Sequence, residues 1–233
     1  MRIFIGTSGY SYAAWKGKFY PPRTAAKDML GFYAQHFGTV EINNTFYRMP
    51  TPAVLEAWAA QVPQDFRFTL KVPRRITHER RLGSIDVDLA YFLEVSAHLG
   101  ARLGPLLFQT PPNLHRDDVK LEKLLTLLPL EAKAAFEFRH ASWFAQPVYD
   151  LLAKHRAALA VTETDEAPAG PVVPTADFCY ARLRRSEYSD AELEAWLTRL
   201  QAPGVTQAYV YFKHEDDARG PAFAMRVQGM LKR

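Results

Sequence analysis

Short apolar runs alternate with amphipathic segments along the whole chain. Eight runs have the length and composition of β-strands, and they span residues 2–6, 39–42, 66–71, 106–109, 134–138, 158–161, 178–183 and 208–212. Between them, apolar residues recur every three to four positions, which is the spacing of a buried helix face. These helical segments span residues 27–37, 52–62, 87–99, 119–128, 147–155, 190–200 and 221–231. Pro168, Pro171 and Pro174 follow the sixth strand, and the helix after that strand is predicted to be missing or degenerate.

Two helix starts carry capping signals. Thr51 followed by Pro52 is typical of an N-cap and a first helical position. Ser189 and Glu192 have the spacing of a capping box. These signals support the predicted starts of the second and sixth helical segments.

Eight strands joined by helices predict a closed (β/α)8 TIM barrel, slightly reduced in size, that occupies residues 1–233 as one domain. The 233 residues divided among eight strands give about 29 residues per unit, which fits a βαβ repeat. An open doubly wound sheet is the alternative. It is less favoured because no GxGxxG pattern follows any of the predicted strands.

The composition is that of a folded soluble protein. Apolar residues make up 48% of the chain and aromatic residues 13%, whereas a disordered chain holds fewer of both. No apolar stretch approaches the roughly 18 residues of a membrane span, and the strand-like N-terminus does not resemble a signal peptide. The single Cys179 cannot form an internal disulfide or a CxxC zinc site. We therefore expect a cytoplasmic protein without a membrane partner.

Polar and charged side chains gather where the predicted strands end. In a TIM barrel the loops after the strands form the active face, and we expect these side chains to converge at one mouth. The candidate site residues are Thr7, Ser8, Tyr10, Glu41, Asn43, Lys71, Gln109, Glu137, Arg139, His140, Trp143, Arg182 and Lys213. Buried charges are costly unless they are paired, so a barrel without a function has no need of such a ring.

Two carboxylates in this set, Glu41 and Glu137, are the candidate catalytic residues. One of them would act as the general base, with its pKa set by neighbouring cations and by burial. The alternative is that both serve only as ion-pair partners of Lys71, Arg139 and Arg182.

The cations in the set predict an anionic ligand, because guanidinium groups match phosphate and carboxylate with two parallel hydrogen bonds. The residues expected to hold the anion are Lys71, Arg139, Arg182 and Lys213. The other candidates would shape the pocket around it. Their predicted roles are an anion-binding loop or a plain tight turn for Thr7 and Ser8, substrate orientation for Asn43 and Gln109, and a pocket wall for Tyr10. Trp143 is predicted to be a pocket wall or a residue that packs the loop after the fifth strand, and His140 a ligand contact or a packing residue of the same loop.

A metal site is an open alternative. An oxygen-rich site of this kind suits magnesium or manganese, and it could draw on Glu41, Glu137, His140, Glu163, Asp165 and His214. No tight ligand spacing such as HExxH is present, so no metal ligand is assigned. The sequence carries no motif that specifies a cofactor.

The first loop is rich in aromatic and basic residues, which makes nucleic acid an alternative partner. Its members are Tyr10, Tyr12, Trp15, Lys16, Lys18, Phe19 and Tyr20, and further basic pairs are Arg74-Arg75 and Arg80-Arg81. Such side chains can stack bases and hold phosphates, or they can form an amphipathic lid over the barrel, which we favour. The net charge of +4 permits nucleic-acid binding without requiring it.

Five stretches of the chain resemble signature motifs of the DUF72 family, also called the YecE-like family. They are Gly6-Thr7-Ser8-Gly9-Tyr10-Ser11-Tyr12, residues 40–48, residues 68–78, residues 103–109 and residues 137–143. The similarity runs from Ile3 to about Leu231, with the motifs in the order that the family shows. The resemblance implies a TIM barrel and no settled activity, because the family is one of unknown function.

The chain departs from the family's pattern at its last two strands. It has Phe212-Lys213-His214 where many members carry Phe-Asn-Asn, and Arg182-Leu183-Arg184-Arg185 where many carry Arg-x-His-Gly. Roles of those Asn and His residues therefore do not transfer to this chain. The substitutions also make the expected mouth more cationic.

Together these observations favour an enzyme, such as a hydrolase or another phosphate-ester-processing enzyme, that acts on an anionic, phosphate-bearing substrate at the C-terminal mouth of the barrel. A nucleic-acid-binding barrel, with or without metal-dependent nuclease activity, is the first alternative. A non-catalytic ligand sensor is the second.

Overall fold

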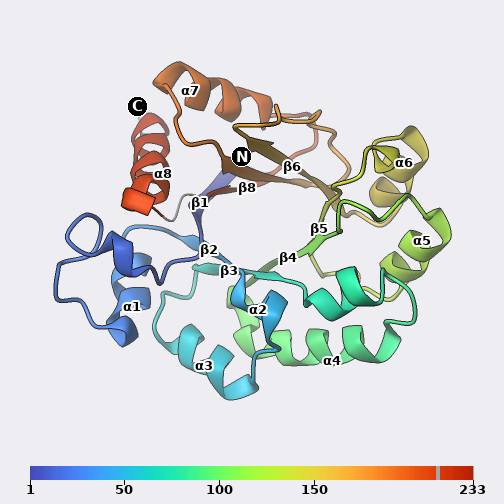
Figure 1. Cartoon of the computed structure of the whole chain (residues 1–233), viewed down its shortest axis with the longest axis horizontal. Helices are drawn as coiled ribbons and strands as arrows, with labels where there is room; N and C mark the ends of the chain where they lie inside the picture. The colour runs from blue at the N-terminus through green and yellow to red at the C-terminus, as the bar shows by residue number, and fades with distance from the viewer. Residues whose placement is uncertain (214–215, 233) are drawn as a thin grey trace.

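The computed structural model describes residues 1–213 and 216–232. Its eight strands are parallel, each pairs with its neighbours in chain order, and β8 pairs with β1 to close the barrel (Figure 1). The strands are β1 (Arg2–Ser8), β2 (Thr39–Ile42), β3 (Arg67–Lys71), β4 (Leu103–Gln109), β5 (Ala134–Glu137), β6 (Ala158–Thr164), β7 (Phe178–Arg184) and β8 (Gln207–Phe212). The prediction of a TIM barrel is confirmed.

Helices flank the barrel on its outer side (Figure 1). They are α1 (Met29–Ala34), α2 (Asn44–Tyr47), α3 (Pro52–Ala60), α4 (Asp86–Ser96), α5 (Asp118–Thr126), α6 (Gln146–Lys154), α7 (Asp190–Arg199) and α8 (Arg219–Met230). Short 3-10 or π-helical segments are η1 (Ala13–Trp15), η2 (Ala26–Asp28), η3 (Arg75–Glu79), η4 (Ala97–Arg102), η5 (Ala141–Trp143) and η6 (Asp216–Ala218). As predicted, residues 165–177 after β6 form no helix. Nowhere in the ranges 1–213 and 216–232 is a helix long and apolar enough to cross a membrane.

The strands extend further toward their carboxyl ends than the apolar runs indicate. β1, β6 and β7 continue to Ser8, Thr164 and Arg184, because parallel pairing carries polar residues into the ladder. Periodicity also does not predict α2 directly after β2, since a single helical turn is too short to show a repeat.

Both predicted capping signals are present in the structure. The Thr51 hydroxyl accepts a hydrogen bond from the N–H of Val54 at the start of α3. Ser189 and Glu192 form the reciprocal bonds of a capping box at the start of α7. Two of the outer helices therefore begin where their local sequence dictates.

The barrel interior changes from apolar to polar toward the carboxyl ends of the strands. Near the amino ends, the Phe4 and Tyr209 rings stack with 4.7 Å between their centroids. Higher up, the Tyr211 hydroxyl lies 2.7 Å from the hydroxyls of both Thr39 and Thr69. A filled core therefore supports the polar layer at the mouth, as is usual for this fold.

Gly6 allows β1 to approach β2 closely. A Cβ atom at this position would lie 2.0 Å from the Thr39 carbonyl oxygen and 2.8 Å from the Tyr33 hydroxyl. That hydroxyl accepts from the Thr7 N–H at 2.8 Å and donates to the Thr39 carbonyl at 3.0 Å. No side chain fits here without displacing the backbone of a neighbouring strand.

We expect Gly6→Ala to destabilise the fold, because its methyl group would displace the β2 backbone. Overpacking costs typically about 1–3 kcal/mol, and we expect the upper end of that range. In a chain of this length the melting temperature would fall by about 6–12 °C, measured by circular dichroism. Gly38→Ala is the control, because nothing lies within 4 Å of its added Cβ. Equal melting temperatures for the two variants would contradict the prediction.

Candidate active site

A buried arginine joins two buried glutamates at the mouth of the barrel. Arg182 on β7 contacts Glu41 on β2 through Nη2 (2.8 Å to Oε1) and Glu137 at the end of β5 through Nη1 (2.5 Å to Oε2). The three side chains are 3%, 0% and 4% exposed, respectively. The sequence placed all three at strand ends, and the structure brings them into direct contact.

Glu41 also accepts hydrogen bonds from side chains on other strands. Its Oε1 accepts from the Ser8 hydroxyl on β1, and its Oε2 accepts from the Tyr180 hydroxyl on β7. Ser8 in turn accepts a bond from the Asn43 amide at 2.7 Å. Both oxygens of this carboxylate are therefore occupied by protein donors.

A second chain of hydrogen bonds links Glu137 to a lysine. The Gln109 amide at the end of β4 donates to Glu137 Oε1 at 2.9 Å. Gln109 Oε1 accepts from Lys71 Nζ at 2.7 Å. Lys71 ends β3, so the network spans six strands of the barrel.

The two carboxyl groups are held as anions. Burial by itself raises the pKa of each group. For Glu41, the charge of Arg182 and the hydrogen bonds from Ser8 and Tyr180 together outweigh burial and lower the pKa. For Glu137, Arg182 is again the main lowering influence. Both pKa values are therefore below their usual range. A general base works best with a pKa near the operating pH, so this setting suits charge stabilisation better than proton transfer.

The pKa of Lys71 lies well below the usual value for a lysine. Burial, followed by the positive charge of Arg182, lowers its pKa to about 8, although Glu41 and Glu137 act in the opposite direction. The side chain remains 8% exposed, and its Nζ lies 4.1 Å from the centre of the Phe46 ring. Lys71 is thus the network member best suited to exchange a proton.

Further cations surround the network at the same end of the barrel. Lys213, half-buried after β8, adds to the lowering of the Lys71 pKa. Arg184 is half-buried at the end of β7, and its pKa is lowered by burial and then by Arg182. The pKa of His78 falls to about 4 through burial, followed by the charges of Lys71 and Arg139. Lys213, Arg139 and Arg184 thus lie close enough to the network to interact with its charges.

Two of the predicted site residues belong to the loop after β5 and pack against that loop and the loop after β4. Trp143 is fully buried, donates from Nε1 to the Leu114 carbonyl at 2.8 Å, and stacks on Phe138 with centroids 4.4 Å apart. It is therefore a packing residue, which is the second of its two predicted roles, and it does not wall the pocket. His140 is half-buried, and its ring lies 3.9 Å from that of His115.

Thr7 and Arg139 also lie outside the hydrogen-bonded network. The Thr7 hydroxyl donates to the Gly9 carbonyl at 2.6 Å and bonds the Tyr33 hydroxyl at 3.0 Å, so its side chain shapes the first loop. Arg139 is exposed and acts on the site only through its charge. Arg139 is exposed because it lies two residues beyond the end of β5, whereas the buried Glu137 is the last residue of that strand.

Tyr180 and Phe46 also contact the network, although neither is among the residues predicted for the site. Tyr180 lies two positions before Arg182 on the same face of β7, so the alternation of a strand could have indicated it. No local pattern indicates that the Phe46 ring lies beneath Lys71, because that contact depends on how α2 folds back over β3.

The metal alternative gains no support from the described side chains. Within the ranges 1–213 and 216–232, no cluster of three or more His, Cys, Asp or Glu residues could hold a metal ion. Glu163 instead accepts from the Trp196 indole at 3.0 Å, and Asp165 accepts from the Ser186 N–H at 3.0 Å. His214 lies outside the described residues.

The aromatic first loop packs on itself and on α1. Trp15 and Tyr20 are both 1% exposed, and their rings stack at 6.1 Å. Phe19 packs against Phe32 and Phe37 of the α1 region, at 5.6 Å in each case. These contacts fit the lid interpretation rather than a surface on which bases stack.

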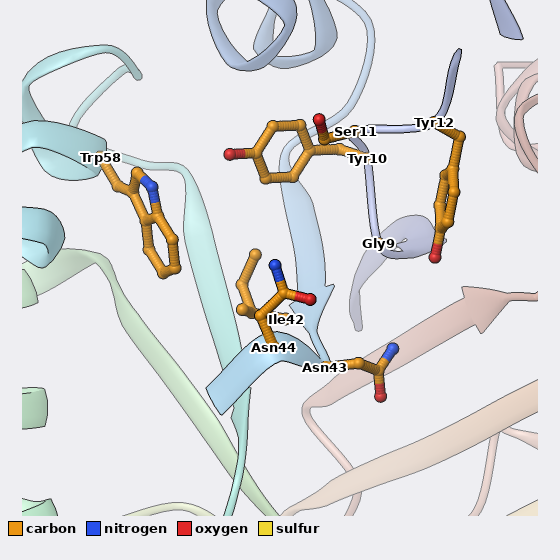
Figure 2. A pocket seen from close by; sticks show the side chains of 8 residues that line it. All are labelled: Gly9, Tyr10, Ser11, Tyr12, Ile42, Asn43, Asn44 and Trp58. Atoms are coloured by element: carbon orange, nitrogen blue, oxygen red, sulfur yellow. The ribbon is translucent and has the colours of Figure 1, made fainter. Parts of the chain in front are cut away.

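A pocket opens beside the charged network (Figure 2). Its cavity volume is about 90 Å³, and its lining residues are Gly9, Tyr10, Ser11, Tyr12, Ile42, Asn43, Asn44 and Trp58. Tyr10 and Asn43 are the predicted site residues that line this pocket.

A closed eight-stranded barrel with a charged network at the carboxyl ends of its strands defines a TIM-barrel protein with a candidate active site at its mouth. The model of a family described as "Protein of unknown function DUF72" matches residues 4–233, and the chain belongs to this family.

Two curated proteins are similar to part of the chain. UPF0759 protein YecE of Escherichia coli (strain K12) is 33% identical over 145 residues, which cover 62% of this chain and 51% of YecE. UPF0759 protein YunF of Bacillus subtilis (strain 168) is 29% identical over 157 residues, covering 64% and 54% of the two chains. The chain thus spans about half the length of the curated relatives it matches.

Solved structures share the whole fold. A DUF72 family protein from Thermotoga maritima MSB8 is 27% identical, with a TM-score of 0.87 and 100% of both chains covered. A DUF72 family protein from Enterococcus faecalis V583 is 19% identical, with a TM-score of 0.76 over 100% of this chain and 98% of the other. At 19% identity, the similarity to the Enterococcus faecalis protein shows a shared fold and nothing further.

We expect Arg182→Met to cost about 3–5 kcal/mol of unfolding free energy at neutral pH, because it leaves two buried carboxylates without a cation. Their pKa values would then rise above the unfolded value of about 4.3. A raised pKa stabilises the fold at low pH, so the variant should gain stability as the pH falls from about 7.5 to about 5.5. In the wild type both carboxyl groups stay ionised in the folded and unfolded states over this range, so their lowered pKa values reduce stability only below about pH 5. Urea denaturation at both pH values measures the difference.

The control for this experiment is Arg185→Met. Arg185 pairs with Glu192 at 2.6 Å, but both side chains are partly exposed, at 31% and 43%. Such surface pairs contribute at most about 1 kcal/mol. A similar loss in both variants, or no pH dependence for Arg182→Met, would show that the buried ion pairs do not stabilise the fold.

Proposed function

We propose that this protein is an enzyme that acts on an anionic, phosphate-bearing substrate at the C-terminal mouth of the barrel. The observation that carries the proposal is the placement of Lys71, whose slightly exposed side chain is fixed at the centre of a positively charged mouth. Among the described residues there, side-chain cations outnumber carboxylates: Lys71, Arg139, Arg182, Arg184 and Lys213 face Glu41 and Glu137.

Lys71, with its pKa of about 8, is the proposed proton-transfer residue. Below that pKa the ammonium group attracts the anion and can donate a proton, and above it the amine can accept one. The hydrogen bond to Gln109 and the contact with the Phe46 ring hold Nζ in place. Positioning of this kind is a main source of catalytic rate.

Glu41 and Glu137 take part in this proposal through their charge. Arg182 keeps the pKa of each carboxyl group low, so both stay ionised while the substrate binds. They anchor Arg182 and counteract the lowering of the Lys71 pKa by the surrounding cations. The catalytic residues predicted from sequence thus become positioning residues for Lys71.

Nucleic-acid binding has less support. Arg74 pairs with Glu79 at 3.1 Å, and Arg75 pairs with Asp88 at 2.8 Å. These ion pairs and the buried aromatics of the first loop leave fewer groups for a strand of nucleic acid than the sequence suggests.

We expect the affinity for a phosphate monoester to fall as the pH rises through about 8, because Lys71 loses its positive charge while the ester, with a second pKa of about 6, remains a dianion. Lys71→Met should weaken binding by about ten- to a hundredfold at neutral pH, because one charge-assisted hydrogen bond is lost. The variant should also lose the fall in affinity near pH 8. Isothermal titration calorimetry with phenyl phosphate measures both effects.

Lys133→Met is the matched control. Lys133 is also partly buried with a lowered pKa, but it precedes β5 at the opposite end of the barrel, where its Nζ donates to Oε1 of Gln207 on β8 at 2.6 Å. The control should keep the wild-type affinity and pH profile. An unchanged affinity in Lys71→Met, or no binding of the ester to the wild type, would contradict the proposed anion site.

Turnover distinguishes an enzyme from a ligand sensor. Phosphate esters incubated with the wild type and followed by ³¹P nuclear magnetic resonance should show conversion that Lys71→Met lacks. Binding without conversion of any ester would favour the sensor.

A further inference from the structure

The pocket beside the network has aromatic walls and a polar floor (Figure 2). Tyr10, from the loop after β1, lies across the opening from Trp58 of α3, and the Asn44 amide lies near both. The cavity itself has a volume of about 90 Å³, so a planar ring held between the walls would stay partly open to solvent.

The polar groups of this pocket are available to a ligand. The Tyr10 hydroxyl, the Asn44 amide and the Trp58 indole N–H make no hydrogen bond to another residue in the ranges 1–213 and 216–232. In contrast, the indoles of Trp143 and Trp196 both donate to protein acceptors. The pocket therefore offers two donors and a carboxamide that the fold does not use.

The aromatic walls are held in place by the surrounding structure. The Trp58 ring stacks on the buried Phe68 ring, with centroids 6.0 Å apart and 25° between the planes. The Tyr10 and Tyr33 rings pack with 6.1 Å between their centroids. The backbone carbonyl of Tyr10 accepts a hydrogen bond from the Tyr20 hydroxyl at 2.6 Å. A ligand that enters between the walls meets rings whose orientation is already fixed, which lowers the cost of binding.

The pocket adjoins the charged network directly. Asn43 lines the pocket and donates to Ser8, which bonds Glu41. The single turn of α2 places Asn44 at the pocket and, two residues later, Phe46 against Lys71. The pocket and the network are thus linked through α2 and through the bond from Asn43 to Ser8.

We infer that this pocket binds the base of a free nucleotide whose phosphate lies at Lys71, an inference that rests on the proposed function. Aromatic side chains stack on the faces of bases, and a carboxamide can pair with the donor and acceptor at a base edge. The positive mouth next to the pocket supplies the partner for the phosphate.

Calorimetric titration with the four ribonucleoside monophosphates, their nucleosides and inorganic phosphate tests the inference. At least one monophosphate should bind about tenfold or more tightly than its nucleoside and than inorganic phosphate, because two sites contribute. Trp58→Leu should weaken its binding by roughly five- to 150-fold, the value of one stacked base. The affinity for inorganic phosphate should not change in this variant.

Two further variants guard against a folding defect. Asn44→Ala alters an exposed side chain and should also weaken the monophosphate but not inorganic phosphate. Tyr91→Leu removes an aromatic ring that is 52% exposed on α4 and should change neither. Circular dichroism melting of each variant confirms that it is folded.

The outcomes separate the two proposals. If inorganic phosphate binds through Lys71 but no base adds affinity, this inference is overturned and the proposed function stands. If nucleosides bind as tightly as monophosphates and phosphate does not bind, the proposed function fails, and the nucleotide inference fails with it. A single-stranded oligonucleotide that binds more tightly than every monophosphate would overturn the assignment to a free nucleotide.

Discussion

The burial of Arg182 between Glu41 and Glu137 is the constraint on which the mouth of the barrel depends. Removing a guanidinium from water costs several kcal/mol, so a buried arginine needs charged partners in good geometry. These partners come from β2 and β5, neither of which pairs with β7 in the sheet. The two ion pairs therefore connect strands that no backbone hydrogen bond joins.

The same network sets the chemistry of the candidate site. Arg182 keeps both carboxylates ionised, and the balance between its charge and theirs helps to place the Lys71 pKa at about 8. Gln109 bonds both Glu137 and Lys71, so the position of the lysine depends on that of the carboxylate. Stability and reactivity cannot be changed independently here.

Two further features bear on the candidate site. Lys213 follows β8, and its charge lowers the Lys71 pKa further. The short helix α2 connects the charged mouth to the aromatic pocket through Phe46 and Asn44. A positive mouth beside an aromatic pocket is the arrangement from which we infer a nucleotide.

Local sequence determined the strands, most of the outer helices and the end of the barrel at which charged residues gather, because periodicity and capping act over a few residues. It placed Glu41, Lys71, Gln109, Glu137 and Arg182 at that end. Only the tertiary structure decided that Arg182, and not Arg139, is buried between the carboxylates, and that Trp143 packs in the core while Trp58 lines a pocket. These contacts join residues far apart in the chain, so they depend on how the barrel closes and how its loops fold back, which local patterns do not encode.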